Sequence, residues 1–213
     1  MINLENIFYI NLEKRVDRKT QIEAELNKMG LVKNRFPGVI YEPTQPDRFN
    51  NLNIYSPNLI GCQIAHLELL KMAKDKNFDN IIIFEDDFEF TVDKTSFYEQ
   101  IDKFNNLNID FDVLFLSYNV MESEPFNDLI SYGRSVQTTS GYIVNSKCYN
   151  QLISNLEEGL NLHIETQQSW MYCNDQYWKS LQKTNQWFYF NKRIGKQRGG
   201  YSDILNKYVD YRM

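Results

Sequence analysis

The sequence predicts an α/β fold in which a mainly parallel central sheet is covered by helices on both faces. Short, continuously apolar runs alternate with longer segments whose apolar residues recur at helical spacing. The runs lack the polar–apolar alternation of strands that face water on one side, which is typical of a sheet buried on both faces. With 213 residues, 42% of them hydrophobic, the chain can bury one substantial core, and we expect residues 1–213 to form a single domain.

The N-terminal half is predicted to contain three strands and two helices. The strands are expected at Ile7–Leu12, Arg35–Ile40 and Asn80–Phe84, and the helices at Arg15–Met29 and from Asn58 onward. We expect the first and third strands to be neighbours at the centre of the sheet, and Gly30 to end the first helix. The segment Tyr41–Pro57 holds three prolines and no periodicity, so it is predicted to be a mobile loop that orders over a bound ligand.

The C-terminal half continues the alternation less regularly. Strands are predicted at Asp112–Ser117, at Val136–Val144 with a break at Gly141, and at Trp187–Phe190. Helices are predicted from Ser146 to a stop at Gly159, and around Thr166–Gln182. The stretch after Asn161 is rich in aromatic residues and has the weakest pattern.

The charge of the chain argues against binding to nucleic acid. The formal net charge is −5, whereas nucleic-acid binders normally carry a basic excess. The basic cluster Lys192–Arg198 is short, and we interpret it either as a solvated loop or as a clamp on one or two phosphates.

Cysteine content and the absence of long apolar runs indicate the compartment. Cys62, Cys148 and Cys173 are odd in number and widely spaced, so they form neither a disulfide framework nor a zinc-ligand pattern. No basic-then-apolar leader opens the sequence, and no apolar run approaches the roughly 18 residues that span a bilayer. We therefore expect a cytoplasmic chain without a signal peptide or transmembrane segment.

The strongest candidate site is the acidic triplet Glu85-Asp86-Asp87, which follows the most apolar strand. Ligands of open parallel sheets bind at the carboxyl ends of the strands. Successive extended residues point to opposite faces, so Glu85 and Asp87 are expected to project one way and Asp86 the other. A divalent cation held by Glu85 and Asp87 would offset the charge of a departing nucleotide diphosphate. The alternative is a solvated loop or helix start.

Five motifs in a fixed order point to a known family. They are Ile10-Asn11-Leu12 with Arg18, Gly61-Cys62 with His66, the acidic triplet, Ser140-Gly141-Tyr142, and Gln197 with Tyr201-Ser202-Asp203-Ile204. This order resembles glycosyltransferase family 25, which includes bacterial lipopolysaccharide galactosyltransferases and the collagen galactosyltransferases. The resemblance runs from near residue 5 to near residue 205. Asn58 and Ala65 depart from it, and the region between Leu160 and Gln186 matches poorly, so the acceptor is not carried over.

The resemblance implies a GT-A fold and inverting transfer of a hexose, galactose or glucose, from a UDP-sugar to a hydroxyl of a glycan or glycoprotein. It also implies dependence on Mn2+, with Mg2+ as the alternative. The donor-binding residues it implies are Asn11, Arg18, Glu85, Asp86 and Gln197, and the metal ligands are Asp87 and Glu85. The segment Tyr41–Pro57 would then order over the donor.

Inversion needs one general base on the side of the sugar opposite the diphosphate. Asp175 is the first candidate and Glu165 the second, and the alternative interpretation of Asp175 is an exposed helix carboxylate. Arg18 either meets the diphosphate or pairs with a carboxylate on its own helix. His66 has either a structural role or a role beside the metal.

Two other functions remain open at this point. One is a catalytically silent module that binds a nucleotide or carbohydrate. The other is a metal-dependent nucleotidyltransferase, which usually has a Gly-rich phosphate loop that this sequence lacks near its N-terminus. The donor sugar, the acceptor and the oligomeric state are not determined by the sequence.

Overall fold

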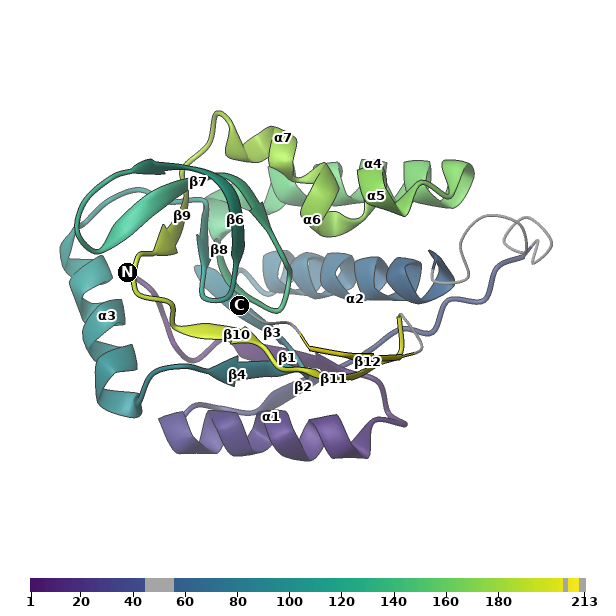
Figure 1. Cartoon of the computed structure of the whole chain (residues 1–213). Helices are drawn as coiled ribbons and strands as arrows, with labels where there is room; N and C mark the ends of the chain where they lie inside the picture. Colours follow the sequence, from purple (N-terminus) through teal and green to yellow (C-terminus); the bar gives the residue numbers. More distant parts are fainter. Residues whose placement is uncertain (45–55, 205–206, 211–213) are drawn as a thin grey trace.

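The computed structural model describes residues 1–44, 56–204 and 207–210, which are built around an eight-stranded sheet (Figure 1). Across the sheet the strands follow in the order β2 (Asn34–Pro37), β1 (Ile7–Asn11), β3 (Asn80–Glu85), β8 (Gly141–Asn145), β5 (Val113–Phe115), β9 (Trp187–Phe190), β7 (Ile130–Gln137) and β6 (Asn119–Pro125). The α/β class is confirmed, but the sheet is not mainly parallel as predicted. The pairing is mixed, because β8 and β7 run antiparallel to each of their neighbours.

Helices cover both faces of the sheet, as predicted (Figure 1). The longer helices are α1 (Val16–Met29), α2 (Ser56–Asp75), α3 (Lys94–Asn106) and α4 (Tyr149–Thr166). On the face of α1 and α3, Leu26 belongs to the same buried cluster as Phe84 of β3. On the face of α2 and α4, Leu70 belongs to a second cluster with Ile83. Adjacent residues of β3 thus point into different cores, which explains why the strand is apolar throughout.

The N-terminal elements lie close to their predicted positions. β1 and β3 are parallel neighbours, with Tyr9 opposite Phe84. α1 ends at Gly30, whose φ of 69° is the left-handed conformation that glycine adopts readily. The predicted loop Tyr41–Pro57 lies mostly outside the described residues, so its closure over a ligand stays a prediction.

Three predictions for the C-terminal half were wrong. Val136–Val144 is not one strand, because β7 ends at Gln137 and β8 begins at Gly141 in another part of the sheet. α4 does not stop at Gly159 but passes through it. A Cβ there would lie 2.8 Å from Cδ1 of Tyr177, so the glycine serves close packing. The single helix around Thr166–Gln182 is instead three short ones, α5 (Ser169–Tyr172), α6 (Asn174–Tyr177) and α7 (Lys179–Gln182).

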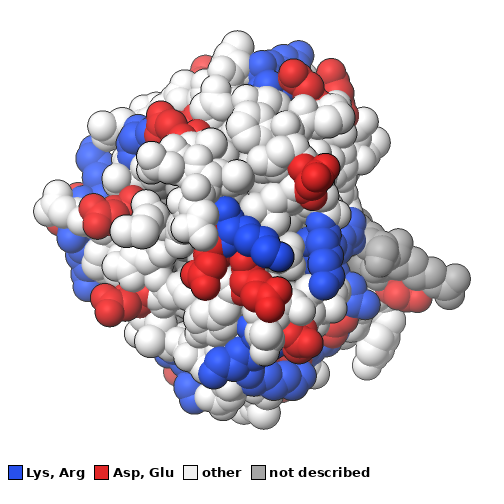
Figure 2. Space-filling model, turned by 90° about the vertical axis from the view of Figure 1, so that its left-hand side faces the viewer, with Lys and Arg blue, Asp and Glu red and all other residues white. Residues whose placement is uncertain are grey.

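Two small antiparallel pairs bring the C-terminal segment back to the end of β3. β4 (Phe88–Phe90) pairs with β10 (Gly195–Gln197), and β11 (Gly200–Ser202) pairs with β12 (Lys207–Val209). Because Gln197 lies opposite Phe88, β10 ends beside the acidic triplet. On the face shown in Figure 2, charges of both signs are interspersed, and no continuous basic surface forms there.

Candidate active site

The acidic triplet lies where β3 ends beside its parallel neighbour β1. The two strands bring Glu85 and Asn11 to the same edge of the sheet, which is where ligands of such sheets bind. After Glu85 the chain turns before β4 begins. The expected alternation of the three carboxylates was therefore wrong: Asp86 and Asp87 lie in the turn and both reach the same guanidinium group, that of Arg18.

Asp86 is held by one residue from β1 and one from α1. Asn11 donates from Nδ2 to Asp86 Oδ2 at 2.8 Å, and Arg18 donates from Nη1 to Asp86 Oδ1 at 2.9 Å. Asn11 is buried, and its Oδ1 accepts from Arg35 Nε at 3.1 Å. Burial raises the pKa of Asp86, although Arg18 and Asn11 oppose the shift. Asn11 therefore contacts the acidic triplet through this hydrogen bond, which holds the Asp86 carboxylate in place.

Asp87 is a buried carboxylate with one free oxygen. Its Oδ2 accepts from Arg18 Nη1 and from Gln197 Nε2, each at 3.1 Å. Its Oδ1 is buried and has no hydrogen-bond partner within the described part of the chain. Burial, followed by the charge of Glu85, raises the pKa of Asp87 to about 7, against the opposing charge of Arg18. The site therefore has more negative charge than Arg18 balances.

Glu85 faces α2 and the loop between β7 and β8. His66 Nε2 lies 3.2 Å from Glu85 Oε1, and the Thr139 hydroxyl donates to the same oxygen. His66 Nδ1 in turn contacts the Tyr142 hydroxyl at 2.8 Å, which fixes the ring. Burial raises the pKa of Glu85, but His66 and Thr139 outweigh it, and the pKa lies below its usual value. His66 thus lies beside the acidic triplet with a partner at each ring nitrogen, and its choice between a structural role and a role beside a metal stays a prediction.

Gly61 allows α2 to pack closely against the segment that follows β2. A Cβ at Gly61 would collide with the carbonyl oxygen of Val39, so only glycine fits. The next residue, Cys62, places Sγ 4.0 Å from Glu85 Oε1. Cys62, His66 and Glu85 offer ligand atoms that all lie within 4.8 Å of one another. The spacing of the glycine, cysteine and histidine in the sequence thus has a structural reason.

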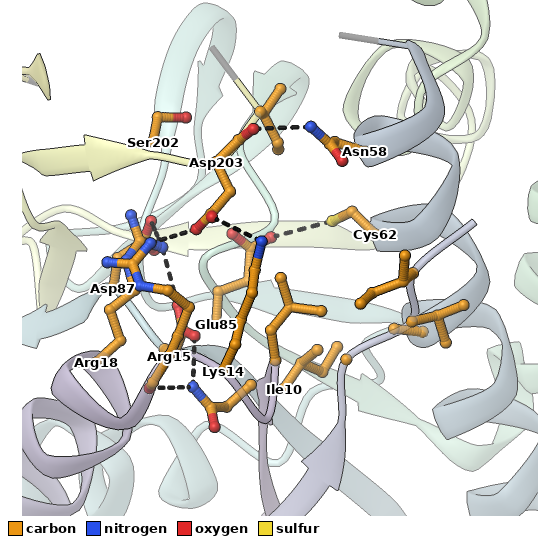
Figure 3. Close-up of a pocket in the computed structure, with 18 of the residues that line it drawn as sticks. Ile10, Lys14, Arg15, Arg18, Asn58, Cys62, Glu85, Asp87, Ser202 and Asp203 are labelled. Carbon is orange, nitrogen blue, oxygen red and sulfur yellow. Dashed lines mark hydrogen bonds and ion pairs between the residues drawn. The ribbon is translucent and has the colours of Figure 1, made fainter. Parts of the chain in front are cut away.

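An open cavity adjoins the acidic triplet (Figure 3). It encloses about 890 Å³, counting its mouth. The structure brings together at this cavity every residue predicted to bind the donor or the metal: Asn11, Arg18, Glu85, Asp86, Asp87 and Gln197. Lys14, Arg15 and Asp203 line it too. The sequence prediction missed Lys14 and Arg15, although both lie between the matched residues Leu12 and Arg18.

A second cavity of about 540 Å³ shares Glu85 and Gln197 with the first. Asp175 lines it and accepts from the backbone N–H of Thr138 at 3.1 Å. Thr138 has a φ of 77°, a strained conformation for a β-branched residue and one that clusters at functional sites. The neighbouring Asn174 is 4% exposed, and its Oδ1 lacks a partner among the described residues. The sequence carried no signal for Thr138 or Asn174 beyond their places next to Thr139 and Asp175.

The remaining candidates lie away from these cavities. Glu165 is exposed in the last turn of α4 and is not among the described residues that line either cavity. Arg198, at the end of the basic cluster, pairs with Glu25 at 3.2 Å and with Glu89 at 2.9 Å. Arg193 lies over the ring of Tyr118 at 4.8 Å. These two arginines are thus engaged by protein groups.

The match to a family extends over most of these elements. Residues 4–167 match the family described as "Glycosyltransferase family 25 (LPS biosynthesis protein)". The chain belongs to glycosyltransferase family 25. The matched range contains β1, the acidic triplet and the α2 motif, and it ends before Asp175 and Gln197.

Curated relatives in family 25 are similar over part of the chain. A "Glycosyltransferase 25 family member" of Drosophila melanogaster is 25% identical over 103 residues, which cover 42% of this chain and 17% of that protein. Its counterpart in Drosophila pseudoobscura pseudoobscura is 27% identical over 103 residues, covering 42% of this chain and 16% of that protein. The alignment thus spans about a sixth of the length of these relatives.

Solved glycosyltransferase structures resemble this family 25 member at low sequence identity. The glycosyltransferase GlyE of Streptococcus pneumoniae TIGR4 is 13% identical, with a TM-score of 0.46 over 89% of this chain and 46% of that one. A glycosyltransferase involved in glycosylation of the major capsid of PBCV-1 is 13% identical, with a TM-score of 0.36 over 78% and 73% of the two chains.

None of the helices in the described ranges is both long enough and apolar enough to cross a membrane.

The residues of the acidic triplet fit a hard divalent cation. Carboxylate oxygens are the ligands that Mg2+ and Mn2+ prefer. Asp87 Oδ1 is a buried oxygen without a partner, and Glu85 carries charge at the same cavity. Uncompensated buried charge is unfavourable, and a cation relieves it. Cys62 and His66 add softer ligand atoms next to Glu85.

Proposed function

We propose that this family 25 member transfers a hexose, galactose or glucose, from a UDP-sugar to a hydroxyl group of a glycan or glycoprotein, with inversion and with Mn2+ or Mg2+. The observation that carries the proposal is the buried, unpartnered Oδ1 of Asp87 beside two further carboxylates. Family membership supports glycosyl transfer as the class of reaction. We also propose that residues 1–213 act as one catalytic domain.

On the donor side, Asp87 with Glu85 would hold the cation. The bound cation supplies positive charge that offsets the charge developing on the leaving UDP. Arg18 and Gln197 fix the orientation of Asp87 through its other oxygen, which leaves Oδ1 free. Asn11 keeps Asp86 in place, so Arg18 remains between the two aspartates.

On the acceptor side, Asp175 is the proposed general base. The acceptor oxygen attacks the anomeric carbon from the face opposite the diphosphate, while the bond from that carbon to the β-phosphate oxygen breaks. UDP leaves with the electron pair of that bond, and the acceptor proton passes to Asp175. The Thr138 N–H orients Asp175, and the free Oδ1 of Asn174 beside it can accept a hydrogen bond from an acceptor hydroxyl. The two cavities share Glu85 and Gln197, which supports placing donor and acceptor side by side.

Product analysis tests the reaction class. The protein is incubated with Mn2+ and either UDP-galactose or UDP-glucose, and separately with UTP and a hexose 1-phosphate. We expect release of UDP, by transfer or slow hydrolysis, in the first case only. Release of pyrophosphate in the second case indicates a nucleotidyltransferase, and release of neither product indicates a silent binding module. The anomeric configuration of the sugar product, read by NMR, then tests inversion.

A further inference from the structure

The carboxylate of Asp203 lies inside the cavity, between two cationic side chains (Figure 3). Lys14 Nζ is 3.3 Å from Asp203 Oδ1, and Arg15 Nη1 forms an ion pair with Asp203 Oδ2. The side chains of Arg15 and Asp203 are only 13% and 23% exposed. An acidic side chain from the C-terminal segment thus occupies a cationic corner of the same cavity that the acidic triplet lines.

The backbone next to Asp203 is bound by Arg15 and by a third cation, Arg18. The carbonyl oxygen of Tyr201 accepts from Arg18 Nη2 at 2.8 Å and from Arg15 Nη1 at 3.4 Å. Asn58 of α2 donates to the carbonyl oxygen of Asp203 at 2.7 Å. The segment therefore uses, for its own attachment, guanidinium N–H groups that could otherwise bind an anionic ligand.

The chemistry of this corner suits a phosphate group as well as the carboxylate that occupies it. Lysine and arginine side chains bind phosphate oxygens through charge-assisted hydrogen bonds. Arg15 is also the N-cap of α1, a helix of 14 residues, so the positive end of the helix dipole lies at this position. Asp17 engages the far side of Arg15, through Nε and Nη2, and leaves Nη1 to the cavity.

We propose that Lys14 and Arg15 form a subsite for the diphosphate of the nucleotide donor, and that Asp203 occupies this subsite when the donor is absent. The identity of the ligand rests on the proposed function, whereas the anion subsite rests on the contacts of Asp203. Donor binding then requires Asp203 to leave Lys14 and Arg15. The Asp203 side chain carries a single negative charge, whereas the diphosphate that would replace it carries at least two.

Calorimetric titration with UDP, and separately with inorganic pyrophosphate, tests the subsite in the presence of Mn2+. Asp203→Asn keeps the shape of the side chain and the backbone contact with Asn58 but removes the competing charge. We expect both probes to bind about two- to fivefold more tightly. Lys14→Met and Arg15→Gln should each lower the affinity for both probes by about tenfold. Lys33→Met, an equal charge change at an exposed position outside the cavity, should leave affinity unchanged.

A double variant guards against an indirect effect on folding. If Asp203 competes at Lys14, the gain from Asp203→Asn should shrink in the Lys14→Met background. The proposal is overturned if Asp203→Asn weakens or does not change binding, if Lys14→Met and Arg15→Gln bind like Lys33→Met, or if neither probe binds the parent. If the variants change affinity as expected but the parent never releases UDP from a UDP-sugar, the subsite stands and only the proposed function is refuted. If the parent transfers sugar but the variants at positions 14, 15 and 203 bind both probes with the affinity of the parent, only the subsite is refuted.

Discussion

Asn11 and Asp86 are 75 residues apart in the sequence, yet Asn11 Nδ2 donates to Asp86 Oδ2 at 2.8 Å. The contact forms because β1 and β3 are parallel neighbours that end at the same edge of the sheet. It connects the first sequence motif to the acidic triplet. The position of Asp86, and through Arg18 that of Asp87, therefore depends on a residue of the first strand.

Replacing Asn11 with Leu should destabilise the fold. The change removes the donor to a buried carboxylate and the acceptor for Arg35, and a buried polar group left without its partner costs about 1–3 kcal/mol. Urea unfolding at pH 7 measures the loss. Asn106→Leu, at an exposed position in α3, is the matched control and should change stability by less than about 0.5 kcal/mol. Equal stability of the two variants would contradict the role of Asn11.

His163 should make the stability of the protein fall in acid. Burial lowers the pKa of His163 to about 4 from the ordinary 6.5. As the pH falls through 6.5, His163 becomes protonated in the unfolded chain but stays neutral in the folded one. Its contribution to the free energy of unfolding is therefore complete above pH 6.5 and is lost between pH 6.5 and 4. Between pH 7 and pH 4 the free energy of unfolding of the parent should fall by on the order of 2 kcal/mol more than that of His163→Gln. Urea unfolding at the two pH values measures the difference. Equal losses would mean that His163 is accessible to protons in the folded state.

The two candidate bases can be compared directly. Asp175→Asn should lower transfer turnover by about a hundredfold to ten-thousandfold, because the amide cannot take the acceptor proton. The affinity for UDP should stay within about twofold of that of the parent, since Asp175 lines only the second cavity. Glu165→Gln, at an exposed position, should leave both quantities unchanged. The reverse pattern would make Glu165 the base.

The sequence predicted the parts of the fold in which local pattern and tertiary structure agree. The apolar run at β3 is buried on both faces, and Gly30 ends α1 with a positive φ, so both were found. Gly159 shows where this reasoning fails. Its local signal is a helix stop, but Tyr177 of α6 packs against it and requires a residue without a side chain.

The composition of the candidate site was predicted better than its geometry. Motif residues from β1, the β3 end and β10 do line one cavity, since the sheet edge collects them. The directions of Glu85, Asp86 and Asp87 were not predictable from strand alternation, because the strand ends at Glu85 and the chain turns. The ion pair between Arg15 and Asp203 spans 188 residues, and nothing in the local sequence indicates it.

The proposed metal site is tested by the Mn2+ dependence of UDP release from a UDP-sugar by the parent and by Asp87→Asn. The amide keeps the shape of the side chain but removes the charge that would hold the cation, and thermal unfolding checks that the variant is folded. We expect a chelator to abolish UDP release by the parent and Mn2+ to restore it, and we expect Asp87→Asn to be slower by about a hundredfold or more at saturating Mn2+. Release by the parent that is insensitive to the chelator, or unchanged Mn2+-dependent release by folded Asp87→Asn, would contradict the proposed metal site.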